Sequence, residues 1–396
     1  MHPSEEIYRQ KSNRLAGKTI VLGITGSIAA VDSFHLIREL IRHGAKVVPV
    51  MTEDAAKIAA PDAIEFASGM KPILSIGGQC EHILHLGDPA DADLFIVYPA
   101  TADCISKMAN GIADDPVTTF ASVALGSGLP VAVAPAMHGF MYSNPAVSKN
   151  IETLRSYGVN IIGPHTDDNR ARVSSIQEVS AWAIRLLSRD DLEGKRMLII
   201  GGRSEEGLDS MRLITNRSTG LMAVTLARSA FERGADVELW MGACNVDLPD
   251  FIPVRRYESV IDLIDMIPEV DHDIVIVPAA LADFRPEKQV PGKIPSDKGF
   301  DLTMTPVPKV LPLLREKCSK VIGFKAESGL SEADLVARAR KRLTEYNLSA
   351  VVANDIDAAG KTSASMLLVT DDGVTDISGS KTASSDGILN FVSEKL

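Results

Sequence analysis

Short apolar runs alternate with longer amphipathic segments along the whole chain. Residues 18–22 form an apolar run, a glycine-containing turn follows at 23–27, and an amphipathic segment continues to about residue 42. Gly44 ends that predicted helix, and residues 45–51, 94–98 and 131–134 are further apolar runs. Strands that alternate with helices in this way indicate an α/β fold with a parallel, doubly wound sheet.

The same pattern restarts near residue 195. Residues 196–200 are apolar, Gly201 and Gly202 follow as a turn, and residues 219–233 have helical periodicity. The segment HGAKVVPVM at 43–51 is similar to RGADVELWM at 233–241. Either an internal duplication or the general likeness of Rossmann-like domains explains this similarity. We therefore predict two doubly wound, mainly parallel, Rossmann-like domains, 1–190 and 191–396, that meet in the charged segment 188–194.

Composition narrows the classes of partner. The 396 residues are 45% hydrophobic and 23% charged, and they carry a net charge of −11, which disfavours nucleic acid and anionic membranes as partners. Four scattered cysteines, with no CxxC pair, argue against a disulfide framework and a zinc site. No segment reads as a signal peptide or a membrane span, so we expect a cytoplasmic protein.

Candidate binding residues follow the predicted strands of the first half. The turn GITGSIAA at 23–30 is typical of a phosphate site at a helix start. Met51-Thr52 stands where a dinucleotide site would need an acidic residue, which favours a mononucleotide. Proline and small residues follow two strands, at 99–103 and 135–142, and leave room for a flat ring. His82, His85 and His138 are candidates for proton transfer, and the first two are expected to begin a strand or turn.

Five short motifs follow in order in the second half. Asn216 and Ser218, in ITNRSTG at 214–220, read as a helix cap before an anion-binding loop. The other motifs are AALADF at 279–284, KI at 293–294, GFKAE at 323–327 and ANDI at 353–356.

The first half resembles the homo-oligomeric flavin-containing Cys decarboxylases, in particular the phosphopantothenoylcysteine decarboxylase family. The matching segments are 23–30, MTEDA at 51–55, EHI at 81–83, PATAD at 99–103 and PAMHGFMY at 135–142. The resemblance implies a flavodoxin-like fold, His82 as the active-site histidine, and His138 and Met141 at the substrate. It also implies FMN held by Gly23, Thr25, Gly26, Ser27, Thr52, Pro99, Ala100, Thr101 and Met137.

Two departures from that family affect the mechanism. His138 stands where the family has an asparagine that contacts the substrate carboxylate, and the segment 163–173 lacks the cysteine of the bacterial flap. Which group assists the return of electrons and a proton to the intermediate therefore stays open, as does the choice between His82 and His85.

The second half resembles the phosphopantothenate–cysteine ligases. The resemblance implies Asn216 at the acyl intermediate, Lys293 at the α-phosphate, and Ala280, Asp283 and Phe324 with Lys293 around the nucleotide. It also implies Arg212 and Ala279, with Asn216, at the substrate, and Mg2+ bridging the nucleotide phosphates without an assigned protein ligand. The family's opening GGTxExID is GGRSEEGLD at 201–209 here, and SSGxMG is STGLMA at 218–223. CTP and ATP remain alternatives for the nucleotide that activates the substrate carboxylate.

Together the two resemblances predict a bifunctional enzyme of coenzyme A synthesis. It would ligate 4'-phosphopantothenate and cysteine through an acyl-nucleotidylate, and then decarboxylate the product to 4'-phosphopantetheine with FMN. Trimeric flavin domains, dimeric ligase domains and a dodecamer are the implied assemblies. The alternatives are a flavin-binding regulatory protein with an inactive decarboxylase half, ligase activity only, and a flavin prenyltransferase, which the fused ligase motifs disfavour.

Overall fold

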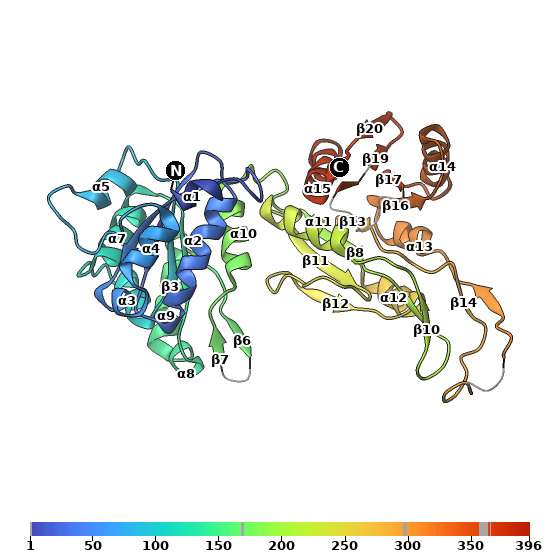
Figure 1. Cartoon of the computed structure of the whole chain (residues 1–396), viewed down its shortest axis with the longest axis horizontal. Helices are drawn as coiled ribbons and strands as arrows, with labels where there is room; N and C mark the ends of the chain where they lie inside the picture. The colour runs from blue at the N-terminus through green and yellow to red at the C-terminus, as the bar shows by residue number, and fades with distance from the viewer. Residues whose placement is uncertain (1, 168–169, 296–298, 356–362, 365) are drawn as a thin grey trace. The chain divides into compact units, whose positions relative to one another are not determined.

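The chain divides into two compact units, residues 1–188 and 189–396, coloured blue to green and yellow to red in Figure 1. The computed structural model describes residues 2–167, 170–295, 299–355, 363–364 and 366–396. The division falls two residues before the predicted boundary, inside the charged segment 188–194. Among the described residues, no helix combines the length and the apolar character that crossing a bilayer requires.

The N-terminal unit is built on a five-stranded sheet of order β2-β1-β3-β4-β5, and every pairing in it is parallel. Consecutive side chains of β1 enter opposite cores: Ile20 and Leu22 pack in one cluster and Val21 in the other. This alternation is what a strand covered on both faces requires. The strands are β1 (Thr19–Ile24), β2 (Lys46–Met51), β3 (Leu94–Ala100), β4 (Val131–Pro135) and β5 (Asn160–Ile161).

Helices cover both faces of this sheet. Helices α2 and α10 bury Leu36 and Val179 in one core, while α7 and α9 bury Phe120 and Leu154 in the other. A hairpin, β6 (His165–Asp167) and β7 (Arg170–Arg172), precedes α10. The helices are α1 (Pro3–Glu6), the 3-10 helix η1 (Ile28–Asp32), α2 (Ser33–Arg42), α3 (Glu53–Ile58), α4 (Pro61–Ser68), α5 (Glu81–Leu86), α6 (Ala102–Ala109), α7 (Pro116–Ser127), α8 (Gly139–Tyr142), α9 (Pro145–Ser156) and α10 (Ile176–Leu187).

The C-terminal unit has an eight-stranded sheet of order β12-β11-β8-β13-β16-β17-β19-β20. Its pairings are parallel from β12 to β17 and antiparallel from β17 to β20, so the sheet is mainly parallel, as the sequence predicts. The strands are β8 (Arg196–Gly201), β11 (Asp236–Met241), β12 (Val254–Arg256), β13 (Ile274–Val277), β16 (Val321–Glu327), β17 (Ala350–Asp355), β19 (Met366–Val369) and β20 (Val374–Asp376).

Helices again lie on both faces, with Leu226 and Ile388 in one core and Leu263 and Leu314 in the other. The helices are α11 (Leu221–Glu232), α12 (Val260–Met266), the 3-10 helix η2 (Ile267–Glu269), α13 (Val310–Lys317), α14 (Glu332–Glu345) and α15 (Lys381–Lys395). Short strand pairs lie outside the main sheet: β9 (Glu205–Gly207) with β10 (Leu213–Thr215), β14 (Phe284–Pro286) with β15 (Met304–Pro306), and β18 (Ser363–Ala364) with β21 (Gly379–Ser380).

Three local expectations were wrong. His82 and His85 lie within helix α5 rather than at the start of a strand or turn. Residues 28–32, expected to be the first turns of an α-helix, form the 3-10 helix η1. The cap of α11 is Gly220, with φ 82°, rather than Asn216 or Ser218. A glycine tolerates this left-handed conformation, so the preceding loop can turn sharply into the helix.

The close approach of α11 to the end of β8 yields a test of the C-terminal fold. A Cβ atom on Gly201 would lie 2.0 Å from the Cβ of Ala223, so Gly201→Ala must push the helix away from the sheet. We expect the free energy of unfolding of this unit to fall by about 1–3 kcal/mol, the usual cost of overpacking. Thermal denaturation measures the change, and Gly373→Ala, where nothing lies within 4 Å, is the matched control. Equal melting temperatures for both variants would contradict the contact.

Candidate active sites

Thr25 joins two strand ends at the carboxyl edge of the N-terminal sheet. Its buried hydroxyl donates to the carbonyl of Pro99 at 2.7 Å and accepts from the N–H of Thr101 at 3.0 Å. The next strand joins the same edge, because the N–H of Ala136 donates to the carbonyl of Ala100 at 2.8 Å. The predicted cofactor residues after β1, β3 and β4 are therefore brought together.

Three hydroxyl side chains cap helices that start at this edge. Ser27 caps η1, Thr52 caps α3 and Thr101 caps α6, each by accepting a backbone N–H of the following helix. A hydroxyl that accepts in this way still has its own proton to donate. The edge therefore combines helix starts with hydroxyl groups, which suits the phosphate of a mononucleotide.

Gly23 and Gly26 provide space rather than unusual backbone angles. Neither has a positive φ, so the backbone angles at these two positions do not themselves require glycine. A Cβ atom on Gly26 would lie 2.6 Å from the Cβ of Asp54, and one on Gly23 would lie 2.9 Å from Cγ1 of Val117. These positions accept only glycine without displacement of α3 or α7.

The two candidate histidines of α5 have different surroundings. Nδ1 of His85 lies 2.6 Å from the Asp91 carboxylate, and the side chain is buried. Nδ1 of half-buried His82 is shielded from solvent and has no hydrogen-bond partner among the described residues. A buried, unpaired ring nitrogen carries a desolvation cost that a bound ligand would remove. His82 is therefore the better candidate for contact with a ligand.

The segment after β4 places two predicted substrate residues at the surface. His138 caps α8, its Nδ1 accepting from the N–H of Phe140 at 3.3 Å, and both His138 and Met141 are exposed. Met137 packs against the core of the unit, half-buried. Met137 thus lies next to the strand edge while the other two side chains face outward.

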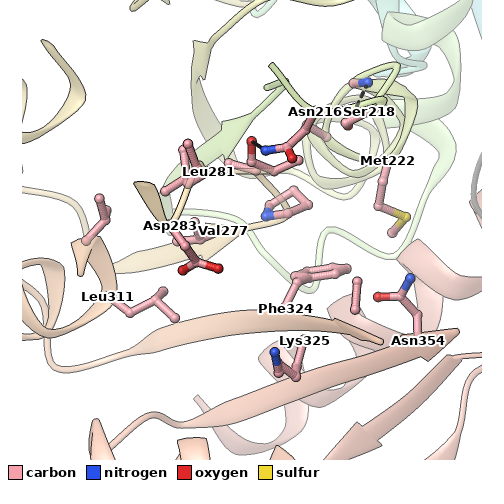
Figure 2. Close-up of a pocket in the computed structure, with 18 of the residues that line it drawn as sticks. Asn216, Ser218, Met222, Val277, Leu281, Asp283, Leu311, Phe324, Lys325 and Asn354 are labelled. Atoms are coloured by element: carbon pink, nitrogen blue, oxygen red, sulfur yellow. Dashed lines mark hydrogen bonds between the residues drawn. The ribbon is translucent and has the colours of Figure 1, made fainter. Parts of the chain in front are cut away.

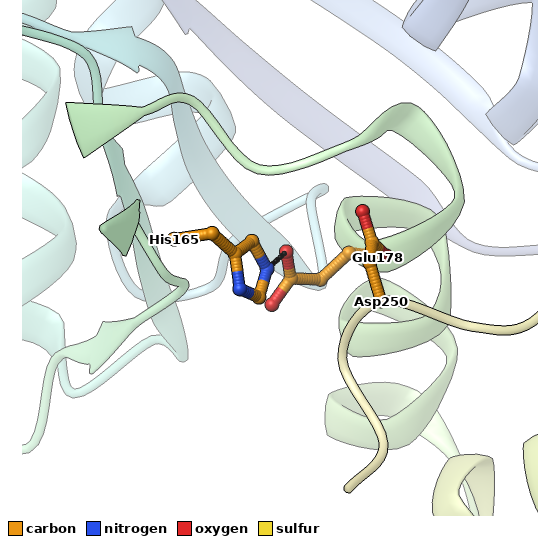
Figure 3. Close-up of side chains that lie close together, drawn as sticks. All are labelled: His165, Glu178 and Asp250. Atoms are coloured by element: carbon orange, nitrogen blue, oxygen red, sulfur yellow. Dashed lines mark hydrogen bonds and ion pairs between the residues drawn. The ribbon is translucent and has the colours of Figure 1, made fainter. Parts of the chain in front are cut away.

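The segment that corresponds to the flap contains the β6–β7 hairpin, and its residues 168–169 lie outside the described residues. His165 anchors the start of the hairpin: its Nε2 lies 2.7 Å from the carboxylate of buried Glu178 in α10, as Figure 3 shows. This pair connects the first hairpin strand to the helix that follows it.

A pocket of about 610 Å3 lies at the carboxyl edge of the C-terminal sheet. Figure 2 shows Asn216 on one side of it and Phe324 and Asn354, from neighbouring strands β16 and β17, on the other. Its lining includes five of the residues expected at the nucleotide and substrate: Asn216, Ala279, Ala280, Asp283 and Phe324.

The start of α11 forms one wall of this pocket. The side-chain amide of Asn216 donates to the carbonyl of Ala280 at 2.9 Å, so the ITNRSTG loop is tied to the loop after β13. Gly220 begins the helix without a side-chain cap, and a Cβ atom there would lie 2.9 Å from that of Cys244. The positive end of a helix dipole thus faces the pocket, which favours an anionic ligand.

Basic side chains that the sequence did not single out also line the pocket. Lys309 forms an ion pair with Asp283, and Lys325 lies 2.8 Å from Glu327, whose carboxyl pKa it lowers through their hydrogen bond. Arg342 packs over the ring of Tyr346. The other two basic lining residues are Arg217 and Lys381. Arg217 and Lys325 lie within the ITNRSTG and GFKAE motifs without an expected role of their own, whereas Lys309, Arg342 and Lys381 lie outside every motif.

Lys293 and Arg212 are not among the residues that line this pocket. Lys293 is exposed, and its neighbour Ile294 donates its N–H to buried Asp209 at 3.0 Å, while the Ile294 carbonyl accepts from Arg212 at 3.2 Å. Three backbone N–H donors, that of Ile294 first, hold the pKa of the Asp209 carboxyl below its usual value. Arg212 and Asp209 therefore hold the backbone beside Lys293.

Comparison with known families also divides the chain into an N-terminal and a C-terminal half. The family described as Flavoprotein matches residues 8–188, and the DNA/pantothenate metabolism flavoprotein C-terminal domain matches residues 192–396. The fold and sites thus define a two-domain α/β enzyme with a flavoprotein half and a pantothenate-metabolism half.

Full-length relatives identify the family. The coenzyme A biosynthesis bifunctional protein of Thermococcus kodakarensis is 42% identical over 377 residues, which cover 93% of each chain. The protein of the same name from Methanocaldococcus jannaschii is 36% identical, over 99% of this chain and 97% of that one. The chain belongs to the family of bifunctional coenzyme A biosynthesis proteins. It is an enzyme with a decarboxylase and a ligase activity, and FMN is its flavin cofactor.

Two solved structures each match about half of the chain. The DNA/pantothenate metabolism flavoprotein from Streptococcus pneumoniae has 22% identity and a TM-score of 0.47, covering 50% of this chain and 98% of its own. The FMN-dependent cysteine decarboxylase SpaF has 31% identity and a TM-score of 0.38, covering 44% of this chain and 99% of its own.

The Thr25 hydroxyl provides a test of the FMN site. Thr25→Val keeps the side-chain shape but leaves the Pro99 carbonyl and the Thr101 N–H without their partner. We expect the free energy of unfolding to fall by about 1–3 kcal/mol, the cost of leaving buried polar groups unpaired. We also expect weaker retention of flavin, measured by flavin absorbance after gel filtration. Thr153→Val, which removes an exposed hydroxyl on α9, is the control. Full flavin retention in both variants would contradict a role of this hydroxyl at the cofactor.

Proposed function

We propose that the N-terminal unit decarboxylates 4'-phosphopantothenoylcysteine to 4'-phosphopantetheine, with FMN at the edge formed by residues 25–27, Thr52 and 99–101. The observation that carries this proposal is the buried, unpaired Nδ1 of His82, because the other candidate on α5, His85, is paired with Asp91. Bound FMN supplies reversible oxidation of the cysteine-derived thiol, which provides an electron sink for the departing carboxylate.

The roles of the chain's own residues follow from their positions. His82 holds or moves a proton at its ring nitrogen, since imidazole exchanges protons near neutral pH. Ser27, Thr52 and Thr101 donate hydroxyl protons to the polar groups of FMN. Met137 packs against the cofactor, and Gly23 and Gly26 leave the space that the cofactor occupies. Exposed His138 and Met141 bind the substrate, with His138 as a donor to its carboxylate.

We propose that the C-terminal unit joins 4'-phosphopantothenate to cysteine in the pocket that contains Asn216. A carboxylate oxygen of the substrate attacks the α-phosphorus of a nucleoside triphosphate and displaces diphosphate. The cysteine amine then attacks the acyl carbon, and the nucleoside monophosphate leaves. The basic lining and the α11 N-terminus support this proposal, because both stabilise charge that builds up on phosphate oxygens.

Individual roles in the ligase follow the lining of the pocket. Phe324, Asp283 and Ala280 contact the nucleotide, Asn216 and Ala279 hold the acyl intermediate, and Mg2+ bridges the phosphates. Exposed Lys293, on a backbone that Asp209 and Arg212 hold in place, neutralises the α-phosphate. Arg212 has a second role at the substrate phosphate.

Assembly and nucleotide preference complete the proposal. Exposed apolar side chains on both units, such as Phe140 at 74% and Met211 at 71%, support association between copies of the chain. The family resemblance implies trimers of the flavin half and dimers of the ligase half, combined in a dodecamer. Both CTP and ATP satisfy the chemistry, and parallel assays with each nucleotide distinguish them.

The proposed division of labour predicts reciprocal variants. Full-length enzyme is mixed with 4'-phosphopantothenate, cysteine, Mg2+ and CTP or ATP, and products are followed by mass spectrometry. His82→Asn should accumulate 4'-phosphopantothenoylcysteine, with CO2 release reduced at least 100-fold, about the lower limit for loss of a proton-transfer group. Lys293→Gln should block ligation but still decarboxylate added 4'-phosphopantothenoylcysteine.

Surface variants of the same type control for substitution itself. His35→Asn and Lys288→Gln change exposed residues outside both sites and should keep both activities. Decarboxylation at the wild-type rate in His82→Asn would shift the role to His85 or His138. Ligation without CO2 release by the unmodified enzyme would leave ligase activity only.

A further inference from the structure

Lys381 lines the pocket from a part of the fold that none of the ligase motifs includes. It is the first residue of α15, directly after Ser380, whose hydroxyl accepts the N–H of Ala383 at 3.2 Å and caps the helix. The lining also includes Asn354 of β17 and Met366 of β19. Lys381 thus brings the start of helix α15 to the pocket.

This position is unfavourable for a lysine in two independent ways. The side chain is half-buried, and the loss of hydration lowers the pKa of its ammonium group. The residue also stands in the first turn of a 15-residue helix, where the positive end of the helix dipole repels a cation. An anion bound next to this lysine would offset both costs.

The described lining residues do not provide that anion. Asp283 is the acidic residue among them, and it forms its ion pair with Lys309. Lys325 forms an ion pair with Glu327, which is not one of the lining residues. The pocket is therefore strongly basic although the chain has a net charge of −11. Walls of one sign in a cleft concentrate ions of the opposite sign.

We propose that Lys381 is a phosphate-binding residue of the ligase, placed so that its ammonium group and the N-terminus of α15 face the same phosphate group. This inference rests on the proposed ligase function of the pocket. Two substrates carry phosphate, the nucleoside triphosphate and 4'-phosphopantothenate. A bound phosphate reverses both costs, since it pairs with the ammonium group and is attracted by the helix terminus.

Direct binding measurements on the full-length, FMN-loaded enzyme test this assignment. Calorimetric titrations without cysteine use Mg-CTP, Mg-ATP, 4'-phosphopantothenate and unphosphorylated pantothenate as separate probes. Lys381→Met should weaken binding of one phosphate-bearing probe by about ten- to a hundredfold, the loss of one charge-assisted hydrogen bond. Weaker nucleotide binding would show that Lys381 contacts the polyphosphate of the nucleotide. Weaker 4'-phosphopantothenate binding with unchanged pantothenate binding would show that it contacts the 4'-phosphate.

Two further variants and two further readouts separate binding from structure. Lys381→Arg keeps the charge and should bind within about threefold of the wild type. Lys395→Met removes an exposed lysine at the other end of α15 and should change nothing. Because the free protein carries the cost of a half-buried cation, Lys381→Met should melt at the wild-type temperature or above and should decarboxylate at the wild-type rate.

The outcomes distinguish this inference from the function on which it rests. Unchanged binding of every phosphate-bearing probe by Lys381→Met overturns the inference and leaves the ligase proposal in place. A clear fall in melting temperature would show a structural role and overturn it as well. Failure of the unmodified enzyme to bind either nucleotide would overturn the proposed ligase function itself, and the inference with it.

Discussion

Both units depend on the same constraint, the convergence of parallel strand ends at one edge of a sheet. Backbone groups at that edge need partners once the strands stop. In the N-terminal unit the Thr25 hydroxyl connects the ends of β1 and β3. In the C-terminal unit the N–H of Ala280 donates to Gly202 at 2.8 Å, and Gly242 donates to Gly201 at 2.9 Å. The loops that leave each edge, which carry the candidate binding residues, are thereby fixed in place.

The two edges carry different chemistry on this shared geometry. The N-terminal edge is made of small residues and hydroxyl caps, and His82, on helix α5 of the same unit, has an unpaired ring nitrogen. The C-terminal edge is basic and open enough for a pocket of about 610 Å3. An acidic surface and a basic pocket are compatible, because a local cluster of charges dominates the potential inside a cleft.

Motif residues and pocket residues overlap only in part. Asn216, Asp283 and Phe324 come together although 108 positions separate the first from the last, and the resemblance of their motifs to the ligase family pointed to all three. Lys309, Arg342 and Lys381 line the same pocket, yet none of them belongs to a motif. A lone lysine or arginine has no local signal, since most such residues are solvated surface groups.

The α/β class and the family could be predicted from the sequence alone, and the same patterns predict a boundary near residue 190 and the order of the motifs. These properties are local, because apolar periodicity and short motifs depend on neighbouring residues. Tertiary structure decided the rest: the helical setting of His82 and His85 and their different partners, the spatial role of Gly23 and Gly26, and the separation of Lys293 from the pocket lining. Each depends on contacts between residues far apart in the chain, which only packing brings together.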